Sequence, residues 1–401
     1  MSRNAQTDTT FPVPPSLLGG LSIEAFLHDY WQQKPLLIRN AWPDFRPPLT
    51  PEELAGLACE PEVESRLVLE RDGEYPWQVK NGPFPEEAFA RLPETHWSLL
   101  VQRVDRHVPA AAELLRHFLF IPAWRIDDLM ISYAPEYGSV GAHIDNYDVF
   151  LLQGQGRREW QINDCDYSLD DYLSDMDLKL LPHFEATGSW ILEPGDMLYL
   201  PPGIAHHGIA RDNCMTLSVG FRAPSRLDLL SVFADDCLLA GDDRRYSDPL
   251  LEPPRHSHEL PAAARAGLRE LLREALADDD AVDQWLGRQL TRVETEPLPV
   301  PCDPPWKPAT FREACIRYGE LHQSLDARFL FQMTDNGAAL YANGENYSID
   351  DSQIAIWIAE NSVLDVADID ALPAAAVELL CTLFNRGLLG FDDVDEDTVC
   401  E

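Results

Sequence analysis

The 401-residue chain lacks an apolar N-terminal segment and any uncharged apolar run long enough to span a bilayer. Its eight cysteines are scattered, and no two of them form a Cys-x-x-Cys pair. That spacing disfavours both a zinc ribbon and a disulfide framework. These absences predict a cytoplasmic protein with reduced thiols, no signal peptide and no membrane segment.

Lysine is also scarce: only four of the 31 basic residues are lysines, and the formal net charge is −37. Such an acidic chain disfavours direct nucleic-acid binding, because attraction to phosphates dominates that affinity. The charge suits a basic protein partner, whose encounter rate long-range attraction would raise. A saline habitat is an alternative source of the same acidic, lysine-poor surface.

Two stretches contain residues that are typical of a metal site. The first holds His143 and Asp145, and the second holds a hydrophobic strand, a Pro-Pro-Gly turn at residues 201–203, and then His206. Because side chains along a strand alternate between faces, His143 and Asp145 should point the same way. Two imidazoles and one carboxylate form the facial ligand set of non-haem Fe(II) oxygenases, although Mn(II) and Zn(II) also fit it.

The Pro-Pro-Gly turn would deliver the third ligand from a neighbouring strand, since proline restricts the chain and glycine allows a tight bend. Both His206 and His207 are available for that position. Adjacent strand residues face opposite sides, so only one of the two should bind the metal.

These stretches, together with residues 30–39, 124–132, 153–160 and 218–224, resemble JmjC-type 2-oxoglutarate oxygenases of the double-stranded β-helix (cupin-like) superfamily. The resemblance is closest to bacterial ribosomal oxygenases, which hydroxylate an arginine of a large-subunit ribosomal protein. It implies a mainly β catalytic core that uses Fe(II), 2-oxoglutarate as co-substrate and molecular oxygen. The family places its third ligand three residues after the turn glycine, which favours His206 over His207.

The resemblance also implies roles for residues around the metal. Arg158 would bind the far carboxylate of 2-oxoglutarate, because a guanidinium can donate two parallel hydrogen bonds to a carboxylate. Ser132 would add a hydroxyl to the same carboxylate. The residues implied to line a pocket for the substrate arginine are Asp128, Met130, Tyr147 and Ser218. Without the resemblance, Arg158 would fit a solvated surface charge equally well, and Met130 would fit core packing.

The catalytic domain is expected over residues 1–225, with a polar arm at residues 1–20 and an acidic insertion at 164–181. Helical patterns then predict a middle domain at 226–298, which the resemblance implies to be a dimerisation domain of a homodimer. Two Asn-Gly turns between apolar runs signal hairpins in a C-terminal α+β domain of winged-helix type at 299–401. Its acidic flank disfavours DNA binding.

Three functions compete at this point. The first is hydroxylation of a ribosomal-protein arginine on its β-carbon, and the second is hydroxylation of another residue, such as a histidine, by the same kind of oxygenase. The third is a non-catalytic cupin-like scaffold. The complete ligand set and Arg158 favour an enzyme, and the Asp128–Met130 pair favours arginine as the substrate.

Overall fold

The computed structural model describes residues 14, 16–71, 74–164, 180, 181, 183–241, 244–248, 258, 260–293 and 298–391. The chain divides into two compact units, with the boundary between Ala223 and Pro224. Within the described ranges, no helix has the length and apolar character that crossing a bilayer requires. Most of the predicted acidic insertion, residues 165–179, lies outside the described residues, as does the acidic C-terminal flank.

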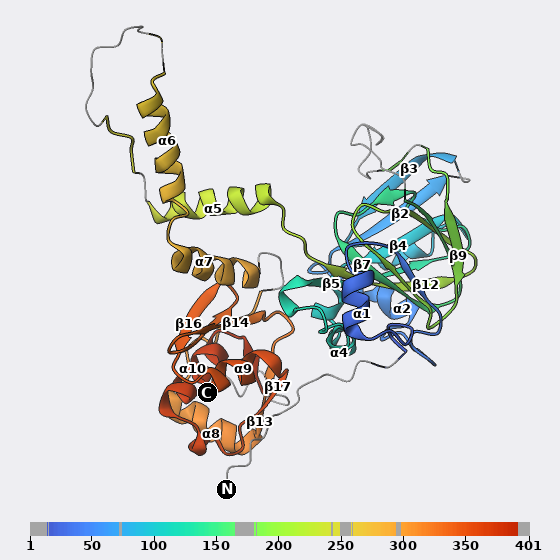
Figure 1. Ribbon diagram of the computed structural model, residues 1–401. Helices are drawn as coiled ribbons and strands as arrows, with labels where there is room; N and C mark the ends of the chain where they lie inside the picture. Colours follow the sequence, from blue (N-terminus) through green and yellow to red (C-terminus); the bar gives the residue numbers. More distant parts are fainter. Residues whose placement is uncertain are drawn as a thin grey trace. The chain divides into compact units, whose positions relative to one another are not determined.

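In the described part of the first unit, antiparallel strands form two sheets (Figure 1). Among the described residues, the larger sheet has the order β1 (Leu36–Ile38), β10 (Met197–Leu200), β7 (Asp148–Gln155), β12 (Cys214–Phe221), β5 (Ile126–Ala134), β4 (Trp97–Val101), β2 (Ser65–Arg71), β3 (Glu74–Asn81). The smaller sheet has the order β6 (His143–Ile144), β11 (Ala205–Ala210), β8 (Arg158–Asn163), β9 (Gly188–Leu192). This architecture confirms the predicted mainly β core.

Short helices accompany the larger sheet. They are α1 (Ile23–Asp29), α2 (Pro51–Leu57), α3 (Glu86–Phe89), α4 (Pro109–Arg116) and the 3-10 turns η1 (Val104–Arg106) and η2 (Ala123–Arg125). Thr50 and Glu53 begin α2 with a reciprocal capping box. The prediction of a polar arm over residues 1–20 is wrong at its end: Leu17 and Leu18 are buried in the same apolar cluster as Phe26 of α1. Burial of two leucines outweighs the polar character of the preceding residues.

Period-two alternation explains why the central strands are apolar throughout. In β7, Phe150 belongs to the cluster shared with the helices, whereas Val149 and Leu151 pack against Trp160 of the smaller sheet. Both faces of the strand are therefore buried. The same alternation in β5 sends Leu129 and Ile131 toward the helices and leaves Asp128, Met130 and Ser132 on the inner face.

The second unit begins with helices α5 (Arg226–Ala240), α6 (Ala262–Glu274) and α7 (Asp279–Thr291). An α+β fold follows, made of α8 (Pro308–Tyr318), β13 (Glu320–Gln323), β14 (Phe329–Thr334), β15 (Gly337–Ala342), β16 (Glu345–Ile349), α9 (Ser352–Glu360), β17 (Val363–Asp365), η4 (Ile369–Ala371), α10 (Ala374–Asn385) and β18 (Leu389–Gly390).

Strands β14, β15 and β16 form two consecutive hairpins, as the Asn-Gly turns predict. At the second turn Asn343 and Gly344 both have positive φ, 43° and 85°, the conformation of a type I′ hairpin turn. Helix α7 packs onto this wing: the hydroxyl of Thr291 accepts the N–H of Gly344 at 3.1 Å.

Candidate active site

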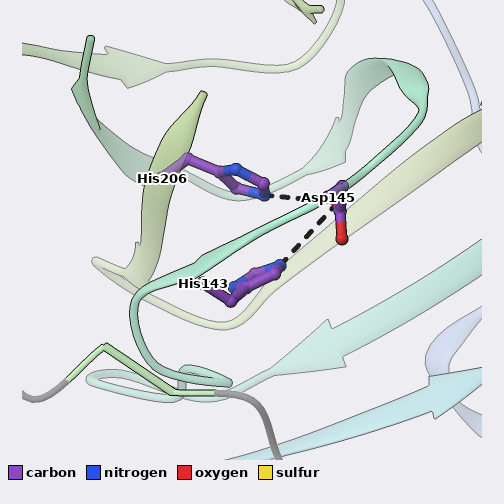
Figure 2. Close-up of side chains that lie close together, drawn as sticks. All are labelled: His143, Asp145 and His206. Atoms are coloured by element: carbon purple, nitrogen blue, oxygen red, sulfur yellow. Dashed lines mark ion pairs between the residues drawn. The ribbon is translucent and has the colours of Figure 1, made fainter. Parts of the chain in front are cut away.

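The three side chains of the predicted metal site converge (Figure 2). His143 lies on β6 and His206 directly opposite it on β11, and Asp145 follows β6. The Asp145 Oδ2 atom is 3.9 Å from Nε2 of His143 and 3.6 Å from Nε2 of His206. One candidate ligand atom from each residue lies within 4.8 Å of the other two, so a single metal ion could contact all three.

Both histidines are held in the tautomer that metal binding requires. The Nδ1–H of His143 donates to the carbonyl of Gly141, and the Nδ1–H of His206 donates to the carbonyl of Ile204, each at 3.0 Å. A carbonyl only accepts, so the proton is on Nδ1 and the lone pair is on Nε2. Burial lowers the pKa of His206 to about 4, which keeps this ring neutral. The donor set therefore fits a divalent metal.

The Pro-Pro-Gly turn has a second function besides directing β11. Its Gly203 has φ of +88°, a left-handed conformation that favours glycine. The Gly203 N–H donates to the backbone carbonyl of Asp145 at 2.8 Å. This hydrogen bond ties the carboxylate residue, which lies beyond the end of β6, to the turn that precedes His206.

His207 faces away from this cluster. Its Nε2 lies 2.9 Å from the hydroxyl oxygen of Ser139, and its ring meets Phe184 edge-on with the ring centroids 6.0 Å apart. Burial, assisted by His143 and Arg158, lowers the pKa of His207 to about 4.

Arg158 lies on the same face of the smaller sheet as His206. In the pairing of β8 with β11, Arg158 is opposite Ala210, and Ile162 is opposite His206. Arg158 is therefore an even number of residues from the position opposite His206, which places the side chains of Arg158 and His206 on the same face. Arg158 is only 3% exposed. Within the described part of the chain, its Nε and Nη2 have no hydrogen-bond partner. A buried guanidinium with free donors fits an anionic ligand, because unpaired buried charge is costly.

The neighbouring Arg157, unlike the buried Arg158, is exposed and paired. Its side chain is about half exposed and pairs with Asp212, with Nε 2.8 Å from Oδ2. Ser132 is buried on the inner face of β5, and its hydroxyl is 3.5 Å from the carbonyl of Thr216 on β12. Arg158 and Ser132 thus belong to the inner faces of the two sheets.

The residues predicted to form the substrate pocket also lie together. Met130 and Ser218 are opposite each other on β5 and β12. Tyr147 is 43% exposed, and desolvation of its phenol, together with the charges of Asp145 and Asp128, raises its pKa. Tyr147 therefore lies within electrostatic reach of the predicted metal ligand Asp145 and of Asp128.

Asp128 accepts the backbone N–H of Arg103 at 3.0 Å. Burial raises the pKa of its carboxyl to about 7, and the nearby Asp127 and Asp105 add to the effect. With its amide nitrogen turned toward Asp128 (3.2 Å), Gln102 also accepts from Nη2 of Arg66 at 3.1 Å. Arg66 and Gln102 were missed in the sequence, since they lie far upstream of the metal motif and carry no pattern of their own.

Two further residues of the site gave little signal in the sequence. Trp160 is 5% exposed, and its ring lies 5.8 Å from the His206 ring and 5.7 Å from the Arg158 guanidinium. Its indole Nε1–H has no partner among the described residues. Ser139, the partner of His207, is 3% exposed.

Comparisons with known proteins agree with this geometry. The JmjC domain family matches residues 113–229, and the ROXA-like winged helix matches residues 274–390. The ribosomal protein uL16 3-hydroxylase of Escherichia coli K12 is 39% identical over 373 residues, covering 92% of this chain and 97% of that protein. A probable ribosomal oxygenase of Haemophilus influenzae is 32% identical, covering 89% and 92% of the two chains.

The same relationship is found among solved structures. The X-ray structure of E. coli YcfD has a TM-score of 0.84 at 38% identity, covering 93% of this chain and 98% of that one. A structure of YcfD, a ribosomal oxygenase, in complex with cobalt and 2-oxoglutarate has a TM-score of 0.80 at 36% identity, with the same coverage. The chain belongs to the ribosomal oxygenase family of JmjC-domain proteins.

Proposed function

We infer that this chain is an Fe(II)- and 2-oxoglutarate-dependent oxygenase that hydroxylates the β-carbon of an arginine in the ribosomal protein uL16. The observation that carries the inference is the convergence of His143, Asp145 and His206 in a chain that matches a uL16 3-hydroxylase over nearly its full length. The convergence disfavours a scaffold without catalysis.

In this proposal the metal is held by Nε2 of His143, a carboxylate oxygen of Asp145 and Nε2 of His206. Bound Fe(II), with 2-oxoglutarate and molecular oxygen, supplies the oxidising power for hydroxylating an unactivated C–H bond and yields succinate and carbon dioxide. The carbonyls of Gly141 and Ile204 fix both imidazoles by accepting their Nδ1–H groups. Such partners orient metal-binding histidines and strengthen them as ligands.

Arg158 would hold the far carboxylate of 2-oxoglutarate, assisted by the hydroxyl of Ser132. The buried, unpaired Nε and Nη2 donors of Arg158 support this role in the described part of the chain. A charge-assisted, two-pronged hydrogen bond would satisfy both donors and place the keto acid end toward the metal ligands. Burial of Arg158 also excludes water from this contact.

The substrate arginine would enter beside Tyr147. Asp128 would pair with its guanidinium, Met130 would contact its aliphatic stem, and Ser218 would line the wall opposite Met130. An acidic residue in this place favours a cationic side chain over the neutral imidazole of a histidine substrate. The strongly negative net charge of the chain also suits a basic ribosomal protein.

We also propose three domains: a catalytic domain at 1–225, a helical dimerisation domain at 226–298 and a winged-helix-like domain at 299–401. Helices α5 and α6 carry exposed leucines, which supports their burial in a homodimer. These are Leu227, Leu230, Leu238, Leu239, Leu268 and Leu272. A ribosomal-protein substrate supports a cytoplasmic location.

The test is mass spectrometry of a uL16 fragment after incubation with the protein, Fe(II), 2-oxoglutarate and ascorbate. One oxygen atom should be added to a single arginine, and a His143→Ala variant should add none. Consumption of 2-oxoglutarate without a modified fragment would keep the oxygenase and refute the substrate. A fragment with histidine in place of that arginine should remain unmodified; its hydroxylation would favour the histidine alternative.

A further inference from the structure

His207 has no part in the reaction proposed above, although it is partly buried and directly follows the metal ligand His206. It follows His206 on β11 but faces the opposite side of the strand. Its Nε2 lies 2.9 Å from the Ser139 hydroxyl, and Phe184 packs edge-on against its ring. The contact with Ser139 connects His207 to a metal ligand through a short series of hydrogen bonds.

The series has three links. The Nδ1–H of His143 donates to the carbonyl of Gly141 at 3.0 Å, the N–H of Gly141 donates to Oγ of Ser139 at 3.0 Å, and Oγ of Ser139 contacts Nε2 of His207. Since Oγ already accepts from Gly141, the Ser139 proton is best placed in a bond to Nε2 of His207. Ser139 is 3% exposed, so water is poorly placed to substitute for this acceptor.

His143 depends on such support because its strand is minimal. Among the described residues, strand β6 has two residues, lies at the edge of its sheet and pairs only with β11. Gly141, which supplies the carbonyl for His143, has φ of +81°, and glycine by itself has wide conformational freedom. The direction of that carbonyl is therefore set by what holds Gly141 in place. The Ser139 hydroxyl accepts the Gly141 N–H, and the Ser98 hydroxyl donates to the Ser139 carbonyl at 3.1 Å. On the other side of Gly141, the N–H of Leu181 donates to the carbonyl of Ala142 at 2.9 Å.

We propose that His207 is a positioning residue for the metal ligand His143, acting through Ser139 and Gly141. The inference rests on the proposed function, because it requires His143 to bind the metal. Hydrogen-bond partners beyond the ligands themselves typically change metal affinity by about 10- to 100-fold when removed. Loss of the His207–Ser139 contact should therefore weaken metal binding while the fold remains intact.

The test uses Co(II) alone as the probe, titrated into the metal-free full-length protein and followed by the visible absorption of the complex. His207→Leu and Ser139→Ala should each raise the Kd for Co(II) about 10-fold or more. Ser139→Ala breaks both links that involve its hydroxyl, and His207→Leu breaks one of them. The double variant should therefore bind Co(II) no more than about threefold more weakly than Ser139→Ala alone. His207→Gln should return the Kd to within about threefold of the wild type, because its amide oxygen can accept the Ser139 proton.

A matched control is His117→Gln, which alters a half-buried histidine that packs on Trp42 in the same unit. Its Co(II) affinity should equal that of the wild type. The proposal is overturned if His207→Leu binds Co(II) within about twofold of the wild type, or if the two single effects multiply in the double variant. It is also overturned if two results occur together: every variant that binds Co(II) more weakly also has a lower unfolding temperature in its metal-free form, and His207→Gln does not restore the Kd.

Should His207→Leu fail to fold, Ser139→Ala removes the His207 contact together with the Gly141 contact through the loss of one oxygen atom, and Co(II) binding within about twofold of the wild type would then overturn the proposal. A wild-type protein that binds no Co(II) would refute the metal site itself, and the proposed function and this role would be rejected together. Wild-type binding with unaffected variants rejects only the role of His207.

Discussion

Replacing Arg158 with methionine should change folding stability and co-substrate binding in opposite directions. Methionine keeps a similar length but removes the charge and the two buried donors that have no partner among the described residues. An unsatisfied buried polar group typically costs about 1–3 kcal/mol. The variant also loses the contact of the guanidinium with Trp160. The free energy of unfolding of the metal-free, ligand-free variant should therefore equal that of the wild type or exceed it by up to about 1–2 kcal/mol.

Binding of 2-oxoglutarate should be strongly impaired in the same variant. Removing one partner of a buried, hydrogen-bonded charge pair costs about 2–5 kcal/mol. At about 1.4 kcal/mol per tenfold, the Kd should rise roughly 30- to 4,000-fold. Arg158→Lys keeps the charge but loses the planar fork, so it should lie between the wild type and methionine.

The assay is isothermal titration of 2-oxoglutarate into Mn(II)-loaded protein without oxygen, together with thermal unfolding. At a 2-oxoglutarate concentration 100 times the wild-type Kd, the wild type should gain about 2.7 kcal/mol of stability, and the methionine variant should gain little. The control Arg157→Met removes the exposed pair with Asp212, so it should lose at most about 1 kcal/mol and bind 2-oxoglutarate normally. Binding by Arg158→Met within about threefold of the wild type would refute the assigned role.

Three further predictions concern the substrate pocket, the turn and the middle domain. Because the pKa of Asp128 is raised to about 7, the KM for a uL16 fragment should increase as the pH falls below about 7, and Asp128→Asn should remove that dependence while lowering kcat/KM about 100-fold. The folded state binds the Asp128 proton more tightly than the unfolded state, so this carboxyl increasingly destabilises the fold as the pH rises from about 4 to 7. Asp128→Asn should therefore stabilise the protein at pH 8 and have little effect at pH 4. Chemical denaturation at both pH values measures the difference. Gly203→Ala places a side chain at φ +88° and should lower the free energy of unfolding by about 1–2 kcal/mol. It should also weaken Co(II) binding. The control is Gly56→Ala in helix α2, where the added methyl group meets open space and should leave Co(II) binding unchanged. Leu272→Glu, at a position 75% exposed on α6, should convert a dimer to a monomer in light scattering, and an unchanged mass would reject the dimerisation role of this helix.

Much of the site could be predicted because its geometry is local. Strand alternation separates His206 from His207 on β11. The same rule predicts a common side for His143 and Asp145 and opposite sides for Arg157 and Arg158, although Asp145 follows β6 and Arg157 precedes β8. The Asn-Gly turns specify hairpins through their own backbone preferences, so β14–β16 could be predicted as well. The buried leucines at 17 and 18 were missed because burial depends on what packs against them.

The sequence by itself determined the ligand types, the faces on which they lie and the mainly β character of the core, since each follows from residue chemistry and a two-residue period. The tertiary structure decided which distant residues meet. Only the pairing of β6 with β11 sets His143 opposite His206, and only the packed loop brings Ser139 to His207. Gln102, which follows β4, likewise reaches Asp128, and Arg66 of β2 reaches Gln102. Such contacts have no local signature, because they arise from long-range closure of the sheets rather than from any preference of the neighbouring residues.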